Sequence, residues 1–373
     1  MITDETSGVW ETWDVFAKAN KGVYPYVGAP ALFSWGRGSV GRLGQSNTTD
    51  VSSPVQIPGT TWSSISGGRN HSLATKTDNT LWSWGSNSFG QLGQNTTTQF
   101  SSPVQIPGTS WSAISGGNYF SLATKTDNTL WSWGYNTIGQ LGQNTTTNVS
   151  SPVQIPGTSW SSISGGGDYH SLAIKTDNTL WSWGRSNFGQ LGQNTTTYFS
   201  SPVQIPGTTW NIISGGGNHS LAIKTDNTLW SWGQGAYGRL GQNTTTNVSS
   251  PIQIPGTTWS VISAGYTHSL ATKTDNTLWS WGYNHRGQLG QNDRTQFSSP
   301  VQIPGTSWSS ISGGNSFSLA TKTDNTLWSW GNNSSGALGQ NDRTNVSSPV
   351  QIPGTTWSSI SGGYQHSLAI LLQ

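Results

Sequence analysis

The stretch Thr80–Asn128, TLWSWGSNSFGQLGQNTTTQFSSPVQIPGTSWSAISGGNYFSLATKTDN, decides the fold, because close variants of it fill nearly the whole chain. Its Trp-Gly dipeptide recurs at spacings of 49, 49, 50, 49, 49 and 49 residues. Seven copies therefore run from Ala31 to Gln373, and the longer interval holds one extra glycine in the turn at residues 165–167. Self-similarity at such a period is typical of repeat architectures. The Trp-Gly pairs begin at Trp35, Trp84, Trp133, Trp183, Trp232, Trp281 and Trp330.

Each copy contains four short apolar runs separated by strong turn signals, which predicts four strands. The pair Asp78-Asn79 predicts a type I′ hairpin between the second and third strands. Seven units without helical periodicity predict an all-β fold, a seven-bladed β-propeller of four-stranded blades. A horseshoe solenoid is the alternative, but neither end has a polar capping repeat. In the second copy the expected strands are Trp62–Ser66, His71–Lys76, Leu81–Gly85 and Val104–Ile106.

The two ends of the repeat region are complementary halves of one blade. The chain enters the first copy at its third strand, Leu32–Trp35, and leaves the last copy after its second strand, His366–Ile370. We therefore expect the N-terminal and C-terminal half-blades to pair and close the ring, which removes a free sheet edge. The expected domains are an N-terminal docking segment, residues 1–30, and the propeller, residues 31–373.

Composition excludes several classes of protein. Only 8% of the residues are charged, against about 25% in an average soluble domain, and the net charge is +2. The chain has no cysteine, so a disulfide framework and a cysteine metal site are excluded. It has no apolar run approaching the ~20 residues of a membrane span, no signal-peptide layout and no polybasic block. We therefore expect no membrane insertion and no nucleic-acid partner.

The candidates for catalysis are few. The only two glutamates, Glu5 and Glu11, lie outside the repeats, so no acid–base pair or nucleophile triad can be assembled from them. Phe120 and Phe317 stand where the other five copies have histidine, which favours packing and hydrogen bonding over metal binding or proton transfer at this position. We expect no enzyme activity, no cofactor and no metal. The five histidines are His71, His170, His219, His268 and His366.

The motifs LWSWG, GQLG, PVQIPG, ISGG, HSLA and KTDN resemble the repeats of the regulator of chromosome condensation family in all seven copies. The resemblance implies a seven-bladed propeller that binds other macromolecules. Members of that family include a nucleotide exchange factor on chromatin, a plant ultraviolet photoreceptor and secreted inhibitors of β-lactamases. The fold alone therefore does not select one function.

Variation between copies is concentrated in three sets of positions. These are the four residues after Trp-Gly, the two before the His/Phe position and the two before Ser-Ser-Pro. Up-and-down strands place all three sets at one end of the propeller, which we term the variable face. The KTDN and PGT turns lie at the other end, the constant face. All eight arginines and the aspartates Asp50, Asp168, Asp293 and Asp342 belong to the variable face, giving it a net charge of +4.

The variable positions are rich in Tyr, Asn, Ser, Gly, Arg and Phe, which is typical of antibody-like binding surfaces. Drift of exposed loops is the alternative, but the exposed turns of the constant face have hardly changed. We therefore predict a recognition face. Its candidate binding residues are Arg37, Arg69, Phe89, Tyr119, Tyr135, Tyr169, Arg185, Phe188, Tyr198, Tyr237, Tyr266, Tyr283, His285, Arg286, Asn332 and Tyr364.

The first thirty residues differ in kind from the repeats. Apolar residues at helical spacing predict a short amphipathic helix that docks through Trp10, Trp13 and Phe16. Such a helix is marginal alone, so we expect it to pack on the propeller or on a partner. The run ITDETSGVWETWDVFAKANKGVYPY resembles opening segments of structural proteins of marine bacteriophages.

These observations favour a virion-associated adhesin that binds a host-surface glycan or protein through the variable face and other virion proteins through residues 1–30. The alternative is a structural module within a phage tail or baseplate. A small-GTPase exchange factor, or an inhibitor-type binding protein, is a further alternative, although no long wedge insertion is present. The expected location is the virion, or otherwise the cytoplasm.

Overall fold

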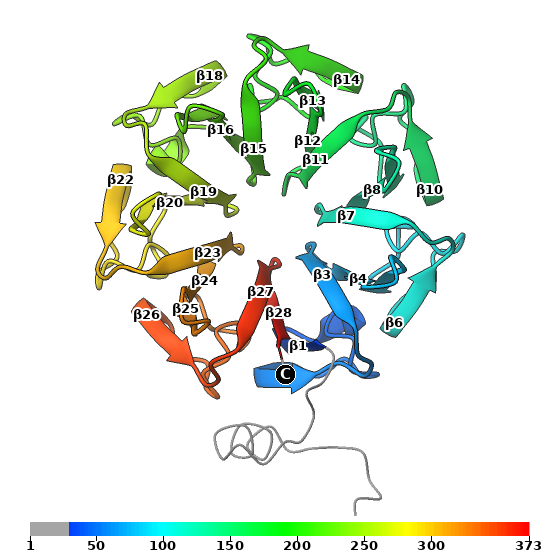
Figure 1. Ribbon diagram of the computed structural model, residues 1–373, viewed down its shortest axis with the longest axis horizontal. Coiled ribbons are helices and arrows are strands. Elements are labelled where there is room, and N and C mark those ends of the chain that lie inside the picture. Colours follow the sequence, from blue (N-terminus) through cyan, green and yellow to red (C-terminus); the bar gives the residue numbers. More distant parts are fainter. Residues whose placement is uncertain (1–29, 373) are drawn as a thin grey trace, which may run out of the picture.

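The computed structural model describes residues 30–372, in which 28 strands form seven four-stranded antiparallel sheets. Figure 1 shows these sheets as blades around a central axis, each with its first strand innermost. The predicted seven-bladed propeller is therefore confirmed. Within residues 30–372 no helix has the length and apolarity needed to cross a membrane.

The second blade shows how one repeat folds. Three of its predicted strands are confirmed, to within one residue. The fourth strand begins at Phe100 and not at Val104, because Phe100 pairs with Gly85 across a register shift that follows Ser83. The four strands are β3 (Trp62–Gly67), β4 (His71–Lys76), β5 (Leu81–Gly85) and β6 (Phe100–Ile106).

The other complete blades repeat this order. The third blade contains β7 (Trp111–Gly116), β8 (Phe120–Lys125), β9 (Leu130–Gly134) and β10 (Val149–Ile155). The fourth contains β11 (Trp160–Gly165), β12 (His170–Lys175), β13 (Leu180–Gly184) and β14 (Phe199–Ile205). The fifth contains β15 (Trp210–Gly215), β16 (His219–Lys224), β17 (Leu229–Gly233) and β18 (Val248–Ile254). The sixth contains β19 (Trp259–Ala264), β20 (His268–Lys273), β21 (Leu278–Gly282) and β22 (Phe297–Ile303). The seventh contains β23 (Trp308–Gly313), β24 (Phe317–Lys322), β25 (Leu327–Gly331) and β26 (Val346–Ile352).

The first blade is the seam of the ring. Its strand order is β2 (Val51–Gln56), β1 (Ala31–Gly36), β28 (His366–Leu371) and β27 (Trp357–Gly362), so both ends of the repeat region share one sheet. Leu32 pairs with Ile370, which confirms the predicted closure.

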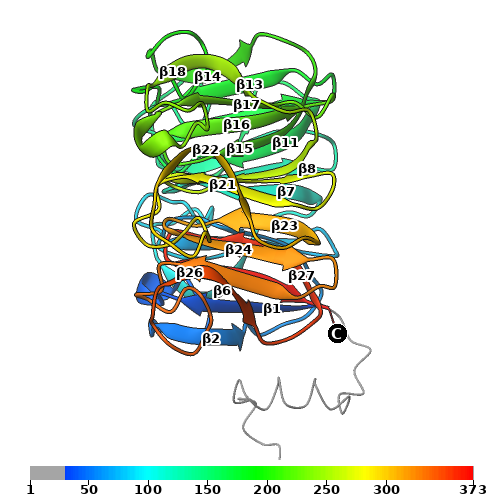
Figure 2. The ribbon, with the colours of Figure 1, turned by 90° about the vertical axis from the view of Figure 1, so that its left-hand side faces the viewer.

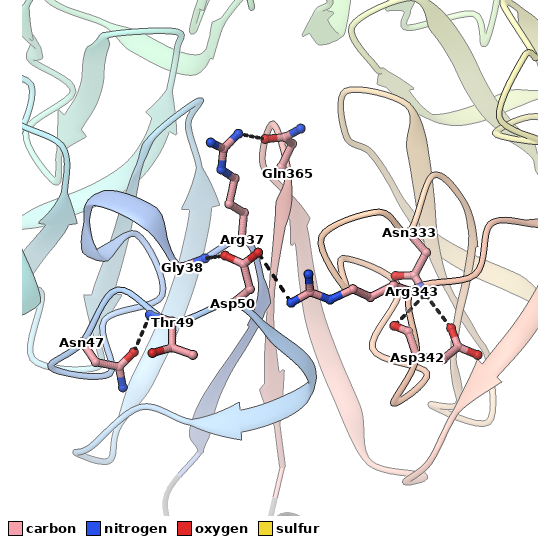
Figure 3. Close-up of polar contacts among 9 residues, drawn as sticks. All are labelled: Arg37, Gly38, Asn47, Thr49, Asp50, Asn333, Asp342, Arg343 and Gln365. Atoms are coloured by element: carbon pink, nitrogen blue, oxygen red, sulfur yellow. Dashed lines mark hydrogen bonds and ion pairs between the residues drawn. The ribbon is translucent and has the colours of Figure 1, made fainter.

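The loops of the seam carry the only ion pair within residues 30–372 (Figure 3). Arg343 of the seventh blade lies 3.6 Å from the carboxylate of Asp50, which also accepts a hydrogen bond from the Gly38 amide at 2.9 Å. Arg37 donates to Gln365 at 2.6 Å, tying the loop after β1 to the turn before β28. Polar contacts thus reinforce the seam at the variable face.

The hairpin turn on the constant face differs from the predicted type I′. Only Asn79 of the Asp78-Asn79 pair has positive φ, 60°, whereas a type I′ turn needs two such residues. The Asp78 carboxylate instead accepts hydrogen bonds from the Thr80 amide and hydroxyl, at 3.0 and 2.6 Å. These hydrogen bonds lower the pKa of Asp78. The lysine of the motif, Lys76, packs over the rings of Trp62 and Trp82, 4.5 Å from the centroid of the latter.

The core lies between blades. One cluster contains Leu32 and Leu368 of the first blade together with Trp62 and Trp84 of the second, all fully buried. The two tryptophans of strand β5 have different environments: Trp84 is buried, whereas Trp82 is half-buried and packs edge-on against Trp62. Only the second of the two rings, Trp84, is therefore fully enclosed between blades.

Three sets of hydrogen bonds join each blade to the next, and each set occurs seven times. In the innermost set the Ser66 hydroxyl accepts from the Gly116 amide at 2.9 Å. In the middle set the carbonyl of Arg42 accepts from both the Trp84 indole and the Ser72 hydroxyl, each at 2.9 Å. In the outer set the amide of Asn95 donates to the carbonyl of Ser150 at 2.8 Å. Neighbouring blades are therefore hydrogen-bonded to each other near the central axis, at the middle of the blade and near the outer rim.

The recurrent histidines extend the middle set. His71 is fully buried, and its Nε2 lies 3.0 Å from the hydroxyl oxygen of Ser121 in the next blade. That hydroxyl already donates to the carbonyl of Gln91, so it accepts from Nε2–H. Nδ1 then has no hydrogen-bond partner among the described residues. Protonation there would bury an uncompensated charge, and burial lowers the pKa of His71 to about 4.

Replacing His71 by Phe should reduce the loss of stability in acid. The unfolded imidazole gains a proton near pH 6.5 and the folded one near pH 4, so stability is complete above pH 6.5 and falls as pH drops towards 4. The expected slope is up to ~1.4 kcal/mol per pH unit for this group. Urea unfolding at pH 7.5, 6.0 and 5.0 measures it.

Phe120 occupies the equivalent position, so the His71→Phe side chain has room. The exposed His285, changed to Phe, is the control and should leave the slope as in the wild type. An equal acid slope in His71→Phe and the wild type would contradict this account.

Candidate functional site

The three variable sets lie at one end of the propeller, as predicted from the up-and-down strands. In Figure 2 this end is on the left, where the short 3₁₀ segment η1 (Ser39–Gly41) follows β1, and the C-terminal end of β28 is on the right. A second segment, η2 (Ala236–Gly238), occupies the equivalent loop of the fifth blade. The loops that vary in sequence thus share one surface.

Glycine lets the seven inner turns converge at the centre of this face. A Cβ atom on Gly67 would lie 2.9 Å from Gly363 of the preceding blade, and one on Gly116 would lie 2.9 Å from Gly68. The turns surround a cavity of about 180 Å³ at the mouth of the central channel. We term it the mouth cavity; its side-chain lining includes Arg69, Asn118, Tyr266, Asn315 and Tyr364.

Four predicted aromatic residues form one cluster beside the mouth cavity. Phe89 contacts Tyr119 and Tyr135, with ring centroids 5.4 and 4.8 Å apart. Tyr169 of the fourth blade stacks on Tyr119 at 6.3 Å and packs against Tyr135 at 5.3 Å. All four side chains are half-buried. Burial raises the pKa of Tyr169, and the neighbouring Tyr119 and the charge of Asp168 raise it further.

Arg69 links this cluster to the other side of the mouth cavity. Its guanidinium lies 5.5 Å from the ring centroid of Tyr119 and 4.5 Å from that of Tyr364, and it donates to the Asn118 side chain at 3.4 Å. Tyr364 in turn contacts Tyr266 edge-on at 5.7 Å. Seven predicted residues from five blades therefore form one continuous group, the central cluster: Arg69, Phe89, Tyr119, Tyr135, Tyr169, Tyr266 and Tyr364.

A polar bridge crosses three blades next to this cluster. The Tyr266 hydroxyl donates to the carboxylate of Asp168, 2.9 Å from both oxygens, and Asn218 donates to the same carboxylate at 2.8 Å. Burial and the charge of Asp168 raise the pKa of Tyr266. Asp168 follows the extra glycine Gly167, whose amide pairs with the carbonyl of Gly216 in the next blade.

Asp168, Asn118 and Asn218 were not among the predicted binding residues. A signal for Asp168 was available, because the only 50-residue interval marks the one turn that differs in length.

A smaller cluster lies farther round the face. Tyr237 packs against Tyr283 at 4.5 Å, and Tyr283 stacks on His285 at 6.1 Å. Tyr237 is 46% exposed and has positive φ, 64°, which is uncommon for a large side chain.

The remaining predicted residues are held by contacts within their own loops. The amides of Phe188 and Arg286 donate to the side chains of the glutamines two residues further on. The Asn332 side chain accepts from the Ser334 amide at 3.1 Å. With its amide oriented to satisfy both neighbours, Asn187 accepts from Arg185 and donates to Tyr198. With these residues and Arg37 at the seam, every predicted binding residue has been placed on the variable face.

Two of the eight arginines are structural. Arg42 and Arg239 are 3% and 2% exposed, so the accessible arginines of the variable face are the other six. Arg42 donates to carbonyls of Ser39 and of Arg69 in the next blade, at 3.0 and 3.1 Å. Burial lowers the pKa of each arginine to about 10.

Part of the sequence variation is also structural. The second residue after Trp-Gly is buried, as in Asn87, whose amide donates to the carbonyls of Thr96 and Thr98 at 2.8 Å. Gly38 and Gly235 replace this residue in the two copies with a buried arginine. A Cβ atom on Gly38 would lie 1.8 Å from the carbonyl oxygen of Thr49, and one on Gly235 would lie 1.9 Å from that of Thr246, so a larger side chain does not fit at this position of these two loops.

The predicted helix and its docking residues Trp10, Trp13 and Phe16 lie outside the described residues. Within residues 30–372 no group of three or more His, Asp or Glu side chains is placed to hold a metal ion.

Comparison with known families now identifies the architecture. Residues 28–263 match the RCC1-like domain, and residues 275–321 and 324–370 match the regulator of chromosome condensation (RCC1) repeat. The chain belongs to the RCC1-like domain family. A second description of the RCC1 repeat matches residues 259–288 and 308–337.

Solved structures share the fold of this RCC1-like domain. Human WBSCR16 is 22% identical, with a TM-score of 0.83 over 92% of this chain and 99% of that one. Yeast RCC1 (Prp20) bound to Kap60 is 22% identical, with a TM-score of 0.82 over 100% of this chain and 94% of that one. Prp20p from Saccharomyces cerevisiae, in a structure described with its binding properties to Gsp1p and histones, is also 22% identical. Its TM-score is 0.83 over 98% of this chain and 96% of that one. The search of curated proteins finds no match to this RCC1-like domain.

Changing Tyr266 to Phe should weaken the polar bridge, because it removes the hydroxyl donor from the carboxylate of Asp168. A hydrogen bond to a charged group contributes about 1.5–3 kcal/mol, and we expect a loss of stability in that range by urea unfolding. Tyr364→Phe, in the same cavity, is the control. A change in Tyr266→Phe no larger than in Tyr364→Phe would refute the bridge.

Proposed function

We propose that this protein is a non-enzymatic binding protein that recognises a protein partner through the central cluster of its variable face. The observation that carries the proposal is the convergence of one arginine and six aromatic side chains from five blades in one cluster, in which Arg69, Tyr266 and Tyr364 line the mouth cavity. Tyrosine and arginine are enriched among the residues that dominate binding energy at protein interfaces.

The scaffold supports this assignment. The turns of the constant face repeat one hydrogen-bonded motif in six copies, whereas the inner turns of the variable face differ from blade to blade. A partner that contacts several blades at once would bind to a combination of residues that no single blade presents. The yeast proteins of the same fold are described in complex with Kap60 and as binding Gsp1p and histones, so this architecture accommodates protein partners.

The predicted virion setting and host-surface glycan gain no support from the family match or from the described residues, and the N-terminal segment that suggested them is outside the described range. A protein partner is therefore the better supported occupant, and a phage adhesin remains a prediction from the sequence.

The double variant Tyr119→Ser, Tyr135→Ser should lose the partner while keeping the fold. Both rings are half-buried at the surface, so their removal takes aromatic contact area from the face without opening the inter-blade core. Affinity capture from the source organism, with wild-type and variant protein side by side, would identify proteins that only the wild type retains. Circular dichroism would verify the fold of the variant.

The matched control changes two exposed threonines of the constant face, Thr77→Ala and Thr126→Ala. It should retain the same proteins as the wild type. Retention of the same proteins by the tyrosine variant would contradict the assignment of the binding face.

Exchange on a small GTPase is the second candidate, favoured by the fold shared with Prp20p across 96% of that chain. The repeats keep a constant length except at Gly167, so the variable face lacks a long insertion that could act as a wedge. We therefore expect this protein to leave the rate of fluorescent GDP release from Gsp1p unchanged. Acceleration that disappears in the tyrosine variant would establish exchange as the function.

A further inference from the structure

The mouth cavity contains two hydrogen-bond donors that the protein itself leaves uncompensated. Asn118 is 2% exposed, and its Nδ2 has no hydrogen-bond partner among the described residues. The guanidinium of Arg69 makes one side-chain hydrogen bond, a long one of 3.4 Å to the oxygen of the same Asn118. A guanidinium offers five N–H donors, so most of those on Arg69 face tyrosine rings or the cavity.

Arg69 also lacks a counter-charge. The one ion pair within residues 30–372 joins Arg343 to Asp50 at the seam, so Arg69 has none. Asp168, the acidic group at this mouth, already accepts hydrogen bonds from Tyr266 and Asn218. Its charge opposes an incoming anion. Tyr266 and Asn218 hold that carboxylate on their side of the mouth, while the guanidinium of Arg69 lies between Tyr119 and Tyr364.

Building on the proposed function, we infer that the mouth cavity receives the carboxylate of an acidic side chain from the protein partner, bound by the Arg69 guanidinium and the Asn118 amide. A carboxylate accepts several hydrogen bonds and matches the forked donors of arginine. Tyr119 and Tyr364 flank the guanidinium, so the aliphatic part of a glutamate or aspartate would pack against their rings. The aromatic residues of the central cluster would supply contact area for the partner. The donors of Arg69 and Asn118 would favour a partner side chain that carries a negative charge.

The size of the cavity limits the ligand. Pockets for drug-sized ligands occupy about 300–1,000 Å³, whereas this cavity measures about 180 Å³. It is therefore closer in size to one side chain than to a drug-sized ligand. A single uncompensated cation also matches the single charge of a carboxylate.

Three capped dipeptides test the inference by isothermal titration calorimetry on the full chain. Ac-Tyr-Glu-NH₂ carries a side-chain carboxylate, Ac-Tyr-Gln-NH₂ is its neutral isostere, and Ac-Tyr-Gln-OH carries only a terminal carboxylate. We expect the glutamate peptide to bind at least tenfold more tightly than either glutamine peptide. Equal affinities for the glutamate peptide and its neutral isostere, or tighter binding of the terminal carboxylate, would overturn the inference.

Two variants locate the site. Arg69→Gln should lower the affinity for the glutamate peptide at least tenfold, to that of the neutral peptide, and Asn118→Asp should do the same by repulsion. Arg69→Lys keeps the positive charge but loses the forked pair of N–H donors. Its affinity for the glutamate peptide should lie between those of the wild type and Arg69→Gln. Arg294→Gln removes an exposed charge elsewhere on the same face and should change the affinity less than twofold. An unchanged affinity in Arg69→Gln would refute the assignment, and thermal unfolding would verify that each variant is folded.

The experiment separates this inference from the proposed function. If the tyrosine variant loses the partner while Arg69→Gln retains it, the function stands and the carboxylate site is refuted. If both variants retain the partner, the proposed function is refuted as well.

Discussion

Among the contacts that join neighbouring blades, one backbone carbonyl per blade accepts two buried hydrogen bonds. In each copy the residue before the Leu-Gly of the GQLG motif presents its carbonyl to the next blade, where a buried tryptophan indole and a serine hydroxyl both donate to it. Because the tryptophan also fills the inter-blade core, the same side chain supplies apolar burial and a directional bond. The contact does not depend on which side chain precedes Leu-Gly, since only the carbonyl takes part. Arginine, glutamine and alanine all occupy that position.

This division between backbone and side chain explains how one face can vary. The scaffold uses glycine, serine, tryptophan and main-chain groups, and it leaves the two residues before each His/Phe position free to differ. The loops are less free than their sequences suggest, because Asn87 and its equivalents are tied to their own loop carbonyls. The recognition that we propose would therefore depend on the residues around the mouth cavity and on the exposed tips of the longer loops.

The sequence determined the fold almost completely, because a 49-residue period with four strand signals leaves few alternatives. The predicted turn type at Asp78-Asn79 was wrong. The Thr80 hydroxyl donates a hydrogen bond to the Asp78 carboxylate, and the turn that forms is not type I′. For the site, the sequence indicated the face and the aromatic residues. It could not show that Arg69, Tyr266 and Tyr364 meet, because they come from blades far apart in the chain. Nor could it distinguish the buried Arg42 and Arg239 from arginines at the surface, since their burial depends on contacts with their own loop and with the next blade.

The cyclic repetition of the inter-blade hydrogen bonds has a consequence for how such a protein can change. Every repeat presents one set of donors and acceptors to the preceding blade and the matching set to the following blade, so any copy can stand beside any other. Gly38 and Arg42, which occur together in one copy, lie within a single loop, four residues apart, and would be transferred together. Recombination between repeats within the gene could therefore exchange, reorder or duplicate the variable loops while keeping the hydrogen bonds between blades. A chain built in this way can acquire a new binding surface by shuffling segments it already encodes.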